Sequence, residues 1–235
     1  MARNGDEAME NNDVPLPFGF SEDLVPIRDN KAPGISKVDF DGRLEAPLQL
    51  YEDLSGGCGG QMWPAGMVLA EYILDHKQLV EGCSILELGA GGGLTGLAVA
   101  TGCPTSGPLY ITDQAVMLPI MQKNIELNGL SLVTAVEYNW GAPAPAPSLL
   151  PPHLDVVLAA DCVYFEPAFP LLQATLQDLI GAKTRCYFCF KKRRRADIAC
   201  IKRIRKMFDV RDIPVDSEGV AERDNIFLME ITKKS

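Results

Sequence analysis

The sequence ILELGAGGGLTG, residues 85–96, joins a short apolar run to a cluster of glycines. A short apolar run bounded by turn residues is typical of a buried strand. Glycines that follow a strand permit positive φ and let a ligand contact the backbone, and the next helix then offers its N-terminal amides. We therefore expect a strand, a loop and a helix, with a ligand bound beyond the carboxyl end of the strand.

The glycine cluster fits two cofactor motifs. In the first, a G-x-G-x-x-G pattern is followed by Asp113, 22 residues after its first glycine, as in a dinucleotide site. Its glycines are Gly91, Gly93 and Gly96. In the second, residues 87–91 read E-x-G-x-G, which is typical of S-adenosylmethionine sites. Glu87 would repel a pyrophosphate but suits an ammonium and a sulfonium, so charge favours the second motif. In both motifs, Asp113 can accept hydrogen bonds from the two ribose hydroxyls.

Strands and helices alternate along the rest of the chain. We expect strands at residues 84–88, 109–112, 132–138, 155–160, 185–190, 209–213 and 225–231. We expect a helix that begins at Trp63 and helices at residues 94–101, 115–127, 169–180 and 195–207. This alternation predicts an α/β fold, a Rossmann-like seven-stranded sheet that is mostly parallel and carries helices on both faces. No helix separates the last two strands, so we expect them to form an antiparallel hairpin at one edge.

Three segments around this pattern have a different character. Residues 1–34 are polar and contain several prolines, which predicts a flexible N-terminal arm before one domain at residues 35–235. Residues 35–51 alternate apolar and polar side chains around Asp41-Gly42, which predicts a β-hairpin. Residues 141–152 contain five prolines and are expected to form a loop.

The charge of the chain is unevenly distributed. Its 22 basic and 31 acidic residues give a net charge of −9, which argues against general nucleic-acid binding and suits a basic partner. Residues 191–206 hold nine Lys or Arg and one acid, a local charge of +8; the rest of the chain has 13 basic and 30 acidic residues, or −17. We interpret this segment as a solvated helix face, a docking surface for an acidic patch of a protein partner, or a local nucleic-acid contact.

Cysteine usage and the N-terminus predict a cytoplasmic protein. The seven cysteines have no repeating spacing, so a disulfide scaffold is not expected. Residues 1–13 lack the basic start and apolar core of a secretory signal, and no apolar run approaches the roughly 20 residues of a membrane span. Cys186 and Cys189 form a CxxC within a predicted strand, where positions i and i+3 face opposite sides, so we expect no metal site.

Four segments together resemble the family 16 protein-lysine methyltransferases, which have a seven-β-strand fold. They are residues 60–65 (GQMWPA), 87–91 (ELGAG), 139–141 (NWG) and the D-x-x-Y motif at residues 161–164. With the order of strands and helices, the resemblance covers residues 45–232. Within the family, FKKRRRAD at residues 190–197 is similar to fungal enzymes that methylate a lysine of translation elongation factor 1-alpha.

The resemblance implies a protein-lysine N-methyltransferase that uses S-adenosylmethionine and acts on a protein, elongation factor 1-alpha. The implied cofactor contacts are Trp63, Gly89, Ala90, Gly91, Asp113, Trp140 and Ala160. Trp63 would line the methionine end, Asp113 would hold the ribose and Trp140 would cover the adenine. Asp161 and Tyr164 would lie where the lysine enters and act as the catalytic pair. We expect a monomer.

Other interpretations of these residues remain open. Asp113 and Asp161 could only cap the following turns, and Tyr164 and the two tryptophans could only pack in the core. Asn124 and Asn128 are interpreted as residues that cap or end a helix. The alternatives to a protein methyltransferase are an NAD-dependent oxidoreductase that uses the first glycine motif, a small-molecule methyltransferase, and an S-adenosylmethionine-binding protein without turnover.

Overall fold

The computed structural model describes residues 32–55, 58–215 and 224–234. The arm predicted at residues 1–34 lies, apart from its last three residues, outside this description.

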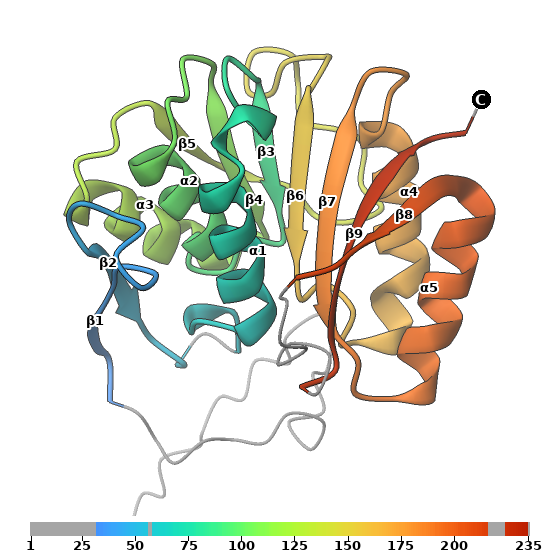
Figure 1. Ribbon diagram of the computed structural model, residues 1–235, viewed down its shortest axis with the longest axis horizontal. Helices are drawn as coiled ribbons and strands as arrows, with labels where there is room; N and C mark the ends of the chain where they lie inside the picture. The colour runs from blue at the N-terminus through green and yellow to red at the C-terminus, as the bar shows by residue number, and fades with distance from the viewer. Residues whose placement is uncertain (1–31, 56–57, 216–223, 235) are drawn as a thin grey trace, which may run out of the picture. The chain divides into compact units, whose positions relative to one another are not determined.

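A seven-stranded sheet forms the centre of the domain (Figure 1). Its strands are β3 (Ile85–Leu88), β4 (Leu109–Asp113), β5 (Val133–Glu137), β6 (Val156–Ala160), β7 (Arg185–Lys191), β8 (Phe208–Ile213) and β9 (Ile226–Lys233). They lie in the order β5-β4-β3-β6-β7-β9-β8. Strands β3 to β7 are parallel, and β9 runs antiparallel between β7 and β8. The predicted parallel sheet with an antiparallel hairpin at one edge is confirmed.

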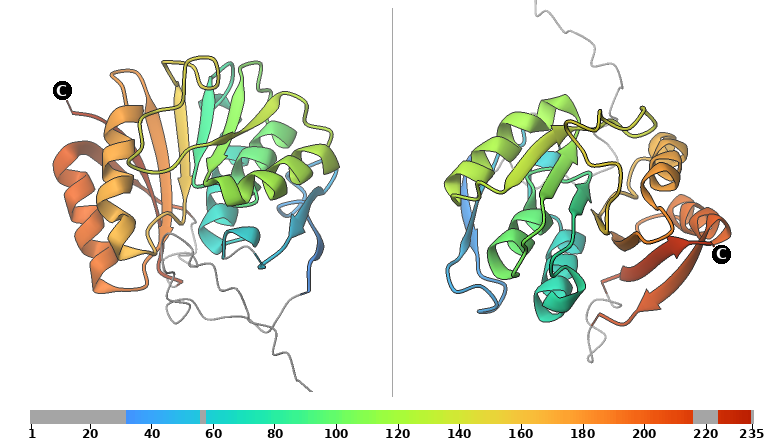
Figure 2. Two further views of the ribbon diagram at one scale, coloured as in Figure 1. Left: turned by 180° about the vertical axis from the view of Figure 1, so that it is seen from behind. Right: turned by 90° about the horizontal axis from the view of Figure 1, so that it is seen from above.

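Helices cover both faces of this sheet (Figures 1 and 2). One face carries α1 (Pro64–Asp75), α2 (Leu94–Gly102) and α3 (Leu118–Leu127), and the other carries α4 (Phe169–Leu179) and α5 (Arg195–Met207). Short 3-10 turns are η2 (Cys58–Gly60), η3 (Lys77–Leu79), η4 (Ala115–Met117) and η5 (Glu166–Ala168). The helix predicted at residues 115–127 divides into η4 and α3, because Pro119 has no N–H and its ring opposes an α-helix that includes residue 115. Over the described residues, no helix has the length and apolar character that a membrane span requires.

Each face of the sheet has its own apolar core. Strand β3 contributes Ile85 to the core under α1, α2 and α3, and Leu86 to the core under α4 and α5. Strand β7 places Cys189 in the first core and Cys186 in the second, so these thiols lie on opposite faces, as their spacing predicts. Burial on both faces explains why these strands read as continuous apolar runs.

The N-terminal hairpin is a separate two-stranded sheet of β1 (Gly34–Val38) and β2 (Leu48–Glu52). It is not closed by the tight turn expected at Asp41-Gly42, because Val38 pairs with Leu48 and residues 39–47 form the connection. Phe40 and Leu44 in this connection are buried in the core. The longer loop thus buries two apolar side chains in the core of the domain, which a two-residue turn would not do.

The connection between β5 and β6 contains no helix, as its prolines predict. It crosses the face of the sheet that carries α4 and α5, where Tyr138, Leu150 and Leu154 are buried in the core. This loop therefore takes the place that a crossover helix has in other parallel sheets.

Candidate active site at the carboxyl edge of the sheet

Three neighbouring strands end at one edge of the sheet and carry most of the predicted site. The glycine loop follows β3, Asp113 ends β4 and Asp161 follows β6. Since β3 is parallel to both β4 and β6, these three ends lie side by side. The Ala90 N–H donates to the Thr112 carbonyl at 2.9 Å, which joins the loop to the end of β4. The structure therefore brings these predicted residues together.

The glycine loop needs residues without side chains. Gly89 and Gly91 have φ of 66° and 55°. A Cβ on Gly91 would lie 2.5 Å from the Gly59 carbonyl oxygen, and one on Gly89 would lie 2.8 Å from the Trp140 ring. The first residues of the loop are thus packed between η2 and Trp140, so that only glycine fits.

Asp113 holds the glycine loop against β4. One carboxylate oxygen accepts the Gly91 N–H at 2.8 Å, and the other accepts the Gln114 N–H at 2.7 Å. Burial raises the pKa of this carboxyl, while the two hydrogen bonds lower it. Each carboxylate oxygen can accept more than one hydrogen bond. Asp113 can therefore shape the loop and still accept ribose hydroxyls.

The two tryptophans contact different parts of this edge. Trp140 follows β5 and packs on Gly89, beside the thiol of Cys162. Trp63 is the residue before α1, and the guanidinium of Arg193 lies 5.5 Å from the centre of its ring. Trp140 therefore borders the glycine loop, whereas Trp63 borders the segment that follows β7.

Asp161 is bound to a residue that the sequence reasoning did not place in the site. Its φ is 54°, and its backbone N–H donates to the Cys189 carbonyl at 2.8 Å, which fixes the turn after β6. Both carboxylate oxygens accept N–H groups of Arg193, at 2.8 and 2.7 Å, and one accepts the Lys191 N–H at 3.3 Å. The Asp161 side chain is only 5 % exposed. A lysine ammonium that approaches this carboxylate must therefore compete with Arg193.

The start of the basic segment makes hydrogen bonds to the rest of the domain. Asp197 is completely buried and accepts the backbone N–H groups of Arg193 and Arg194, each at 2.8 Å. Arg194 donates to the Tyr164 carbonyl, which ties the D-x-x-Y loop to α5. Arg205, near the other end of α5, pairs with Asp212. Arg193 and Arg194 thus have partners within the domain, at Asp161 and Asp197. The basic residues on α5 itself, Arg195, Lys202, Arg203, Arg205 and Lys206, are exposed, as a solvated helix face requires.

Glu87 has a different environment from the one expected. The residue is 3 % exposed, and its carboxyl accepts the Gly96 N–H at 2.8 Å, in the first turn of α2. Burial raises the pKa of Glu87 to about 7, against the hydrogen bonds from Gly96 and Thr95. Its carboxyl therefore joins β3 to α2, and its negative charge is incomplete near pH 7.

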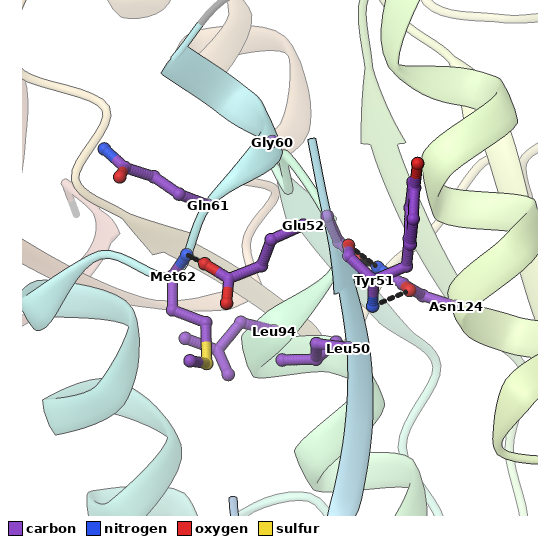
Figure 3. Close-up of a pocket in the computed structure, with 9 residues that line it drawn as sticks. Leu50, Tyr51, Glu52, Gly60, Gln61, Met62, Leu94 and Asn124 are labelled. Atoms are coloured by element: carbon purple, nitrogen blue, oxygen red, sulfur yellow. Dashed lines mark hydrogen bonds between the residues drawn. The ribbon is translucent and has the colours of Figure 1, made fainter. Parts of the chain in front are cut away.

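The hairpin strand β2 is bound to the glycine loop through Asn124 of α3 (Figure 3). This completely buried amide accepts the Tyr51 N–H at 2.7 Å and donates to the carbonyls of Tyr51 and Gly92 at 3.3 and 2.8 Å. Glu52 accepts the Met62 N–H at 3.3 Å, next to Trp63. The cavity between these residues measures about 10 Å³, which is room for one water.

The interpretation of Asn124 and Asn128 as helix-capping residues was incomplete. Asn128 does follow α3, but its amide also pairs with both backbone groups of Gln49, at 2.9 and 2.7 Å. Asn124 lies within the helix and caps nothing. Both asparagines lie on the side of α3 that meets β2, and their spacing of four residues was the signal that could have indicated this.

The remaining predicted residues lie at the same edge. Ala90 is buried in the glycine loop, and Ala160 ends β6 beside Gly66 of α1. Tyr164 is partly buried in the loop that follows Asp161. Across the described part of the chain, no group of three or more His, Cys, Asp or Glu side chains could hold a metal ion.

These residues fit S-adenosylmethionine. Gly89 and Gly91 offer a loop without side chains, and Asp113 offers two hydrogen-bond acceptors next to it. The Trp140 ring closes one side of the loop. Among the atoms nearest to the described loop glycines, none belongs to Lys or Arg, and the carboxylates of Glu87 and Asp113 accept N–H groups of Gly96 and Gly91.

Comparisons with known proteins identify the family to which the chain is similar. Residues 43–207 match a family model described as "Lysine methyltransferase". The chain is 38 % identical over 224 residues to protein-lysine N-methyltransferase EFM6 of Saccharomyces cerevisiae, a match that covers 83 % of this chain and 89 % of that protein. It is 35 % identical over 141 residues to EEF1A lysine methyltransferase 3 of Mus musculus, covering 58 % of this chain and 57 % of that protein.

Solved structures share the fold at low sequence identity. A 16S rRNA N2 G1207 methyltransferase of T. thermophilus, solved with AdoMet and guanosine, has a TM-score of 0.57 and 15 % identity, covering 86 % of this chain and 50 % of that one. A SAM-dependent methyltransferase of Aquifex aeolicus has a TM-score of 0.53 and 18 % identity, and the match covers 72 % of this chain and 93 % of that one. These likenesses concern the fold alone.

Proposed function

The chain belongs to the lysine methyltransferase family, and on that premise we propose that its substrate is a lysine of translation elongation factor 1-alpha. It is a protein-lysine N-methyltransferase that uses S-adenosylmethionine. The proposed substrate is supported by the match to EEF1A lysine methyltransferase 3, whose name specifies that protein. Family membership also sets aside the NAD-dependent alternative of the first glycine motif.

The observation that carries the proposal is the meeting of the glycine loop, Asp113 and Asp161 at one edge of the sheet. We assign the predicted roles to these residues on that basis. The cofactor is held by Trp63 at its methionine end, by the backbone of Gly89, Ala90 and Gly91, by Asp113 at the ribose, by Trp140 at the adenine and by the backbone of Ala160. Asp161 and Tyr164 border the opening for the lysine.

Methyl transfer requires a neutral lysine amine, because an ammonium has no lone pair. S-adenosylmethionine supplies, when bound, a methyl group on a cationic sulfonium. Free lysine has a pKa of about 10.4, so it arrives mostly protonated and must lose its proton. The chain then has to align amine and methyl group, which alone can supply several kcal/mol of the barrier reduction. Tyr164, in the loop after Asp161, forms one wall of this passage.

Three finer proposals accompany the substrate. The partner is a protein, and any nucleic-acid contact is confined to the exposed part of residues 191–206. The enzyme acts as a monomer. It resides in the cytoplasm, in support of which Cys83, Cys103, Cys162, Cys186, Cys189 and Cys200 are free thiols.

The test is transfer of a radioactive methyl group from S-adenosylmethionine to recombinant elongation factor 1-alpha, with the modified residue identified by mass spectrometry. We expect one labelled lysine and a loss of at least tenfold in rate for Asp161→Ala. Asp209→Ala, at an exposed position of β8, is the matched control and should transfer at the normal rate. Label in RNA or in small molecules, with none in protein, would overturn the proposal.

A further inference from the structure

Arg193 lies between two residues to which we assign opposite sides of the active site. Its guanidinium makes a two-point ion pair with Asp161, on the lysine side, and lies 5.5 Å from the ring centre of Trp63, on the cofactor side. Its side chain is 24 % exposed. A permanent cation therefore stands where the substrate lysine is expected to approach its methyl donor.

The position of Arg193 is fixed by the backbone and is not the result of a freely moving side chain. Arg193 follows β7, the parallel neighbour of β6, so its segment starts at the same edge as Asp161. The buried Asp197 carboxylate accepts the Arg193 and Arg194 N–H groups and fixes the turn before α5. Planar two-point pairing of guanidinium with carboxylate is the most directional ion pair in proteins.

We propose that Arg193 is a positioning residue of the methyl-transfer reaction: by occupying both oxygens of Asp161, it denies a free carboxylate to the substrate lysine, which then reaches the methyl donor as a neutral amine. This inference rests on the proposed lysine methylation. A carboxylate with no partner would bind the ammonium form, and that form cannot accept a methyl group. An opposite charge at about 4–6 Å typically raises the pKa of a lysine by one to three units.

Other ionisable groups around Asp161 do not replace Arg193 in this role. Burial raises the pKa of the Cys162 and Cys189 thiols, with the Asp161 charge as a smaller cause, so both stay neutral. The charged or titratable groups around Cys162 and Asp161 include Glu87 on β3, Asp113 on β4, Tyr164 in the loop after β6, Cys186 and Lys191 on β7, and Arg194 and Asp197 at the start of α5. Of the cations, Lys191 meets Asp161 through its backbone N–H, and Arg194 pairs with Asp197.

The test is the pH dependence of kcat/KM for the protein substrate in Arg193→Gln, between about pH 6.5 and 10. We expect the rise of the rate with pH to move up by one unit or more, so that the rate falls at least tenfold at pH 7 and recovers at high pH. Arg193→Lys keeps a cation beside Asp161 but loses the planar two-point pairing, so its profile should move less than that of Arg193→Gln. Arg195→Gln removes the same charge two residues away, at an exposed position, and should keep the wild-type profile.

Adding Asp161→Asn to Arg193→Gln separates charge from structure. The double variant has no carboxylate at this position, so its profile should return to the wild-type pH range even if its maximal rate is low. Melting temperatures of all variants report folding. An equal loss of rate at every pH, or a lower KM without a shifted profile, would overturn the inference while lysine methylation stands. A wild-type enzyme that methylates no lysine would overturn the proposed function and this inference with it.

Discussion

Replacing Asn124 by alanine should destabilise the domain and loosen its cofactor loop. The side chain makes three hydrogen bonds in a completely buried place, to both backbone groups of Tyr51 and to the Gly92 carbonyl. Alanine leaves the Tyr51 N–H and two carbonyls without these partners. A buried donor left unpaired costs about 1–3 kcal/mol, and the carbonyls and the small void add to this.

We therefore expect the free energy of unfolding to fall by about 3 kcal/mol. For a domain of this size, that change lowers the melting temperature by roughly 6–12 °C. The affinity for S-adenosylhomocysteine should fall as well, because Gly92 belongs to the glycine loop and loses its link to α3. Urea denaturation measures the first effect, and isothermal titration calorimetry measures the second.

Two further variants test this prediction. Asn139→Ala is the control, because Asn139 is exposed and bonds to Glu137 at the surface, so the change in unfolding free energy should stay within about 0.5 kcal/mol. Asn124→Asp keeps the shape but cannot donate to the two carbonyls, and it should be about as unstable as Asn124→Ala. If Asn124→Ala unfolds with the same midpoint as Asn139→Ala, the proposed role of this amide as the link between hairpin and loop is wrong.

Three more substitutions test other parts of the site. Burial raises the pKa of Glu87 to about 7, above the 4.5 of an unperturbed Glu, so between these pH values the native state binds a proton that the unfolded chain has lost. The free energy of unfolding of the wild-type protein should therefore fall by about 3 kcal/mol as the pH rises from 4.5 through 7. Glu87→Gln should remove this slope in urea denaturation at pH 5 and pH 8, and an unchanged slope would refute the assignment. Gly91→Ala should weaken S-adenosylhomocysteine binding at least tenfold in calorimetry, because its Cβ would meet the Gly59 carbonyl at 2.5 Å; equal affinity would contradict the described packing. Asp197→Ala should destabilise the domain by about 2 kcal/mol, since two partly buried N–H groups lose their acceptor, and an unchanged urea midpoint would count against this.

Features encoded by neighbouring residues could be predicted from the sequence. The last helix, α5, begins and ends where its pattern predicts, at residues 195 and 207. Asp197 accepts the N–H groups of the two residues before the helix, and the apolar Phe208 starts the next strand. The glycine loop also follows from local rules, since positive φ and close packing leave glycine as the only suitable residue.

Contacts between distant residues could not be predicted in this way. Asn124 bonds to Tyr51 across 73 positions of sequence; its spacing from Asn128 marks a shared helix face, but not the strand that this face meets. The pairing of Asp161 with Arg193 depends on β6 and β7 being neighbours, so that the two residues following them meet. Net charge marked residues 191–206 as one basic segment, but the fold pairs Arg193 with Asp161 and Arg194 with Asp197.

Because of the position of β9, the sheet can be completed only late in synthesis. β9 follows β7 and β8 in the sequence, yet it lies between them in the sheet. β8 pairs with β9. The helix that precedes β8 is α5, whose Asp197 accepts the N–H groups of Arg193 and Arg194. Until residues 226–233 have left the ribosome, β7 keeps an open edge and β8 has no strand to join. The five parallel strands can form earlier, so a chain in synthesis exposes an apolar strand edge at this stage and is open to wrong pairing or chaperone binding.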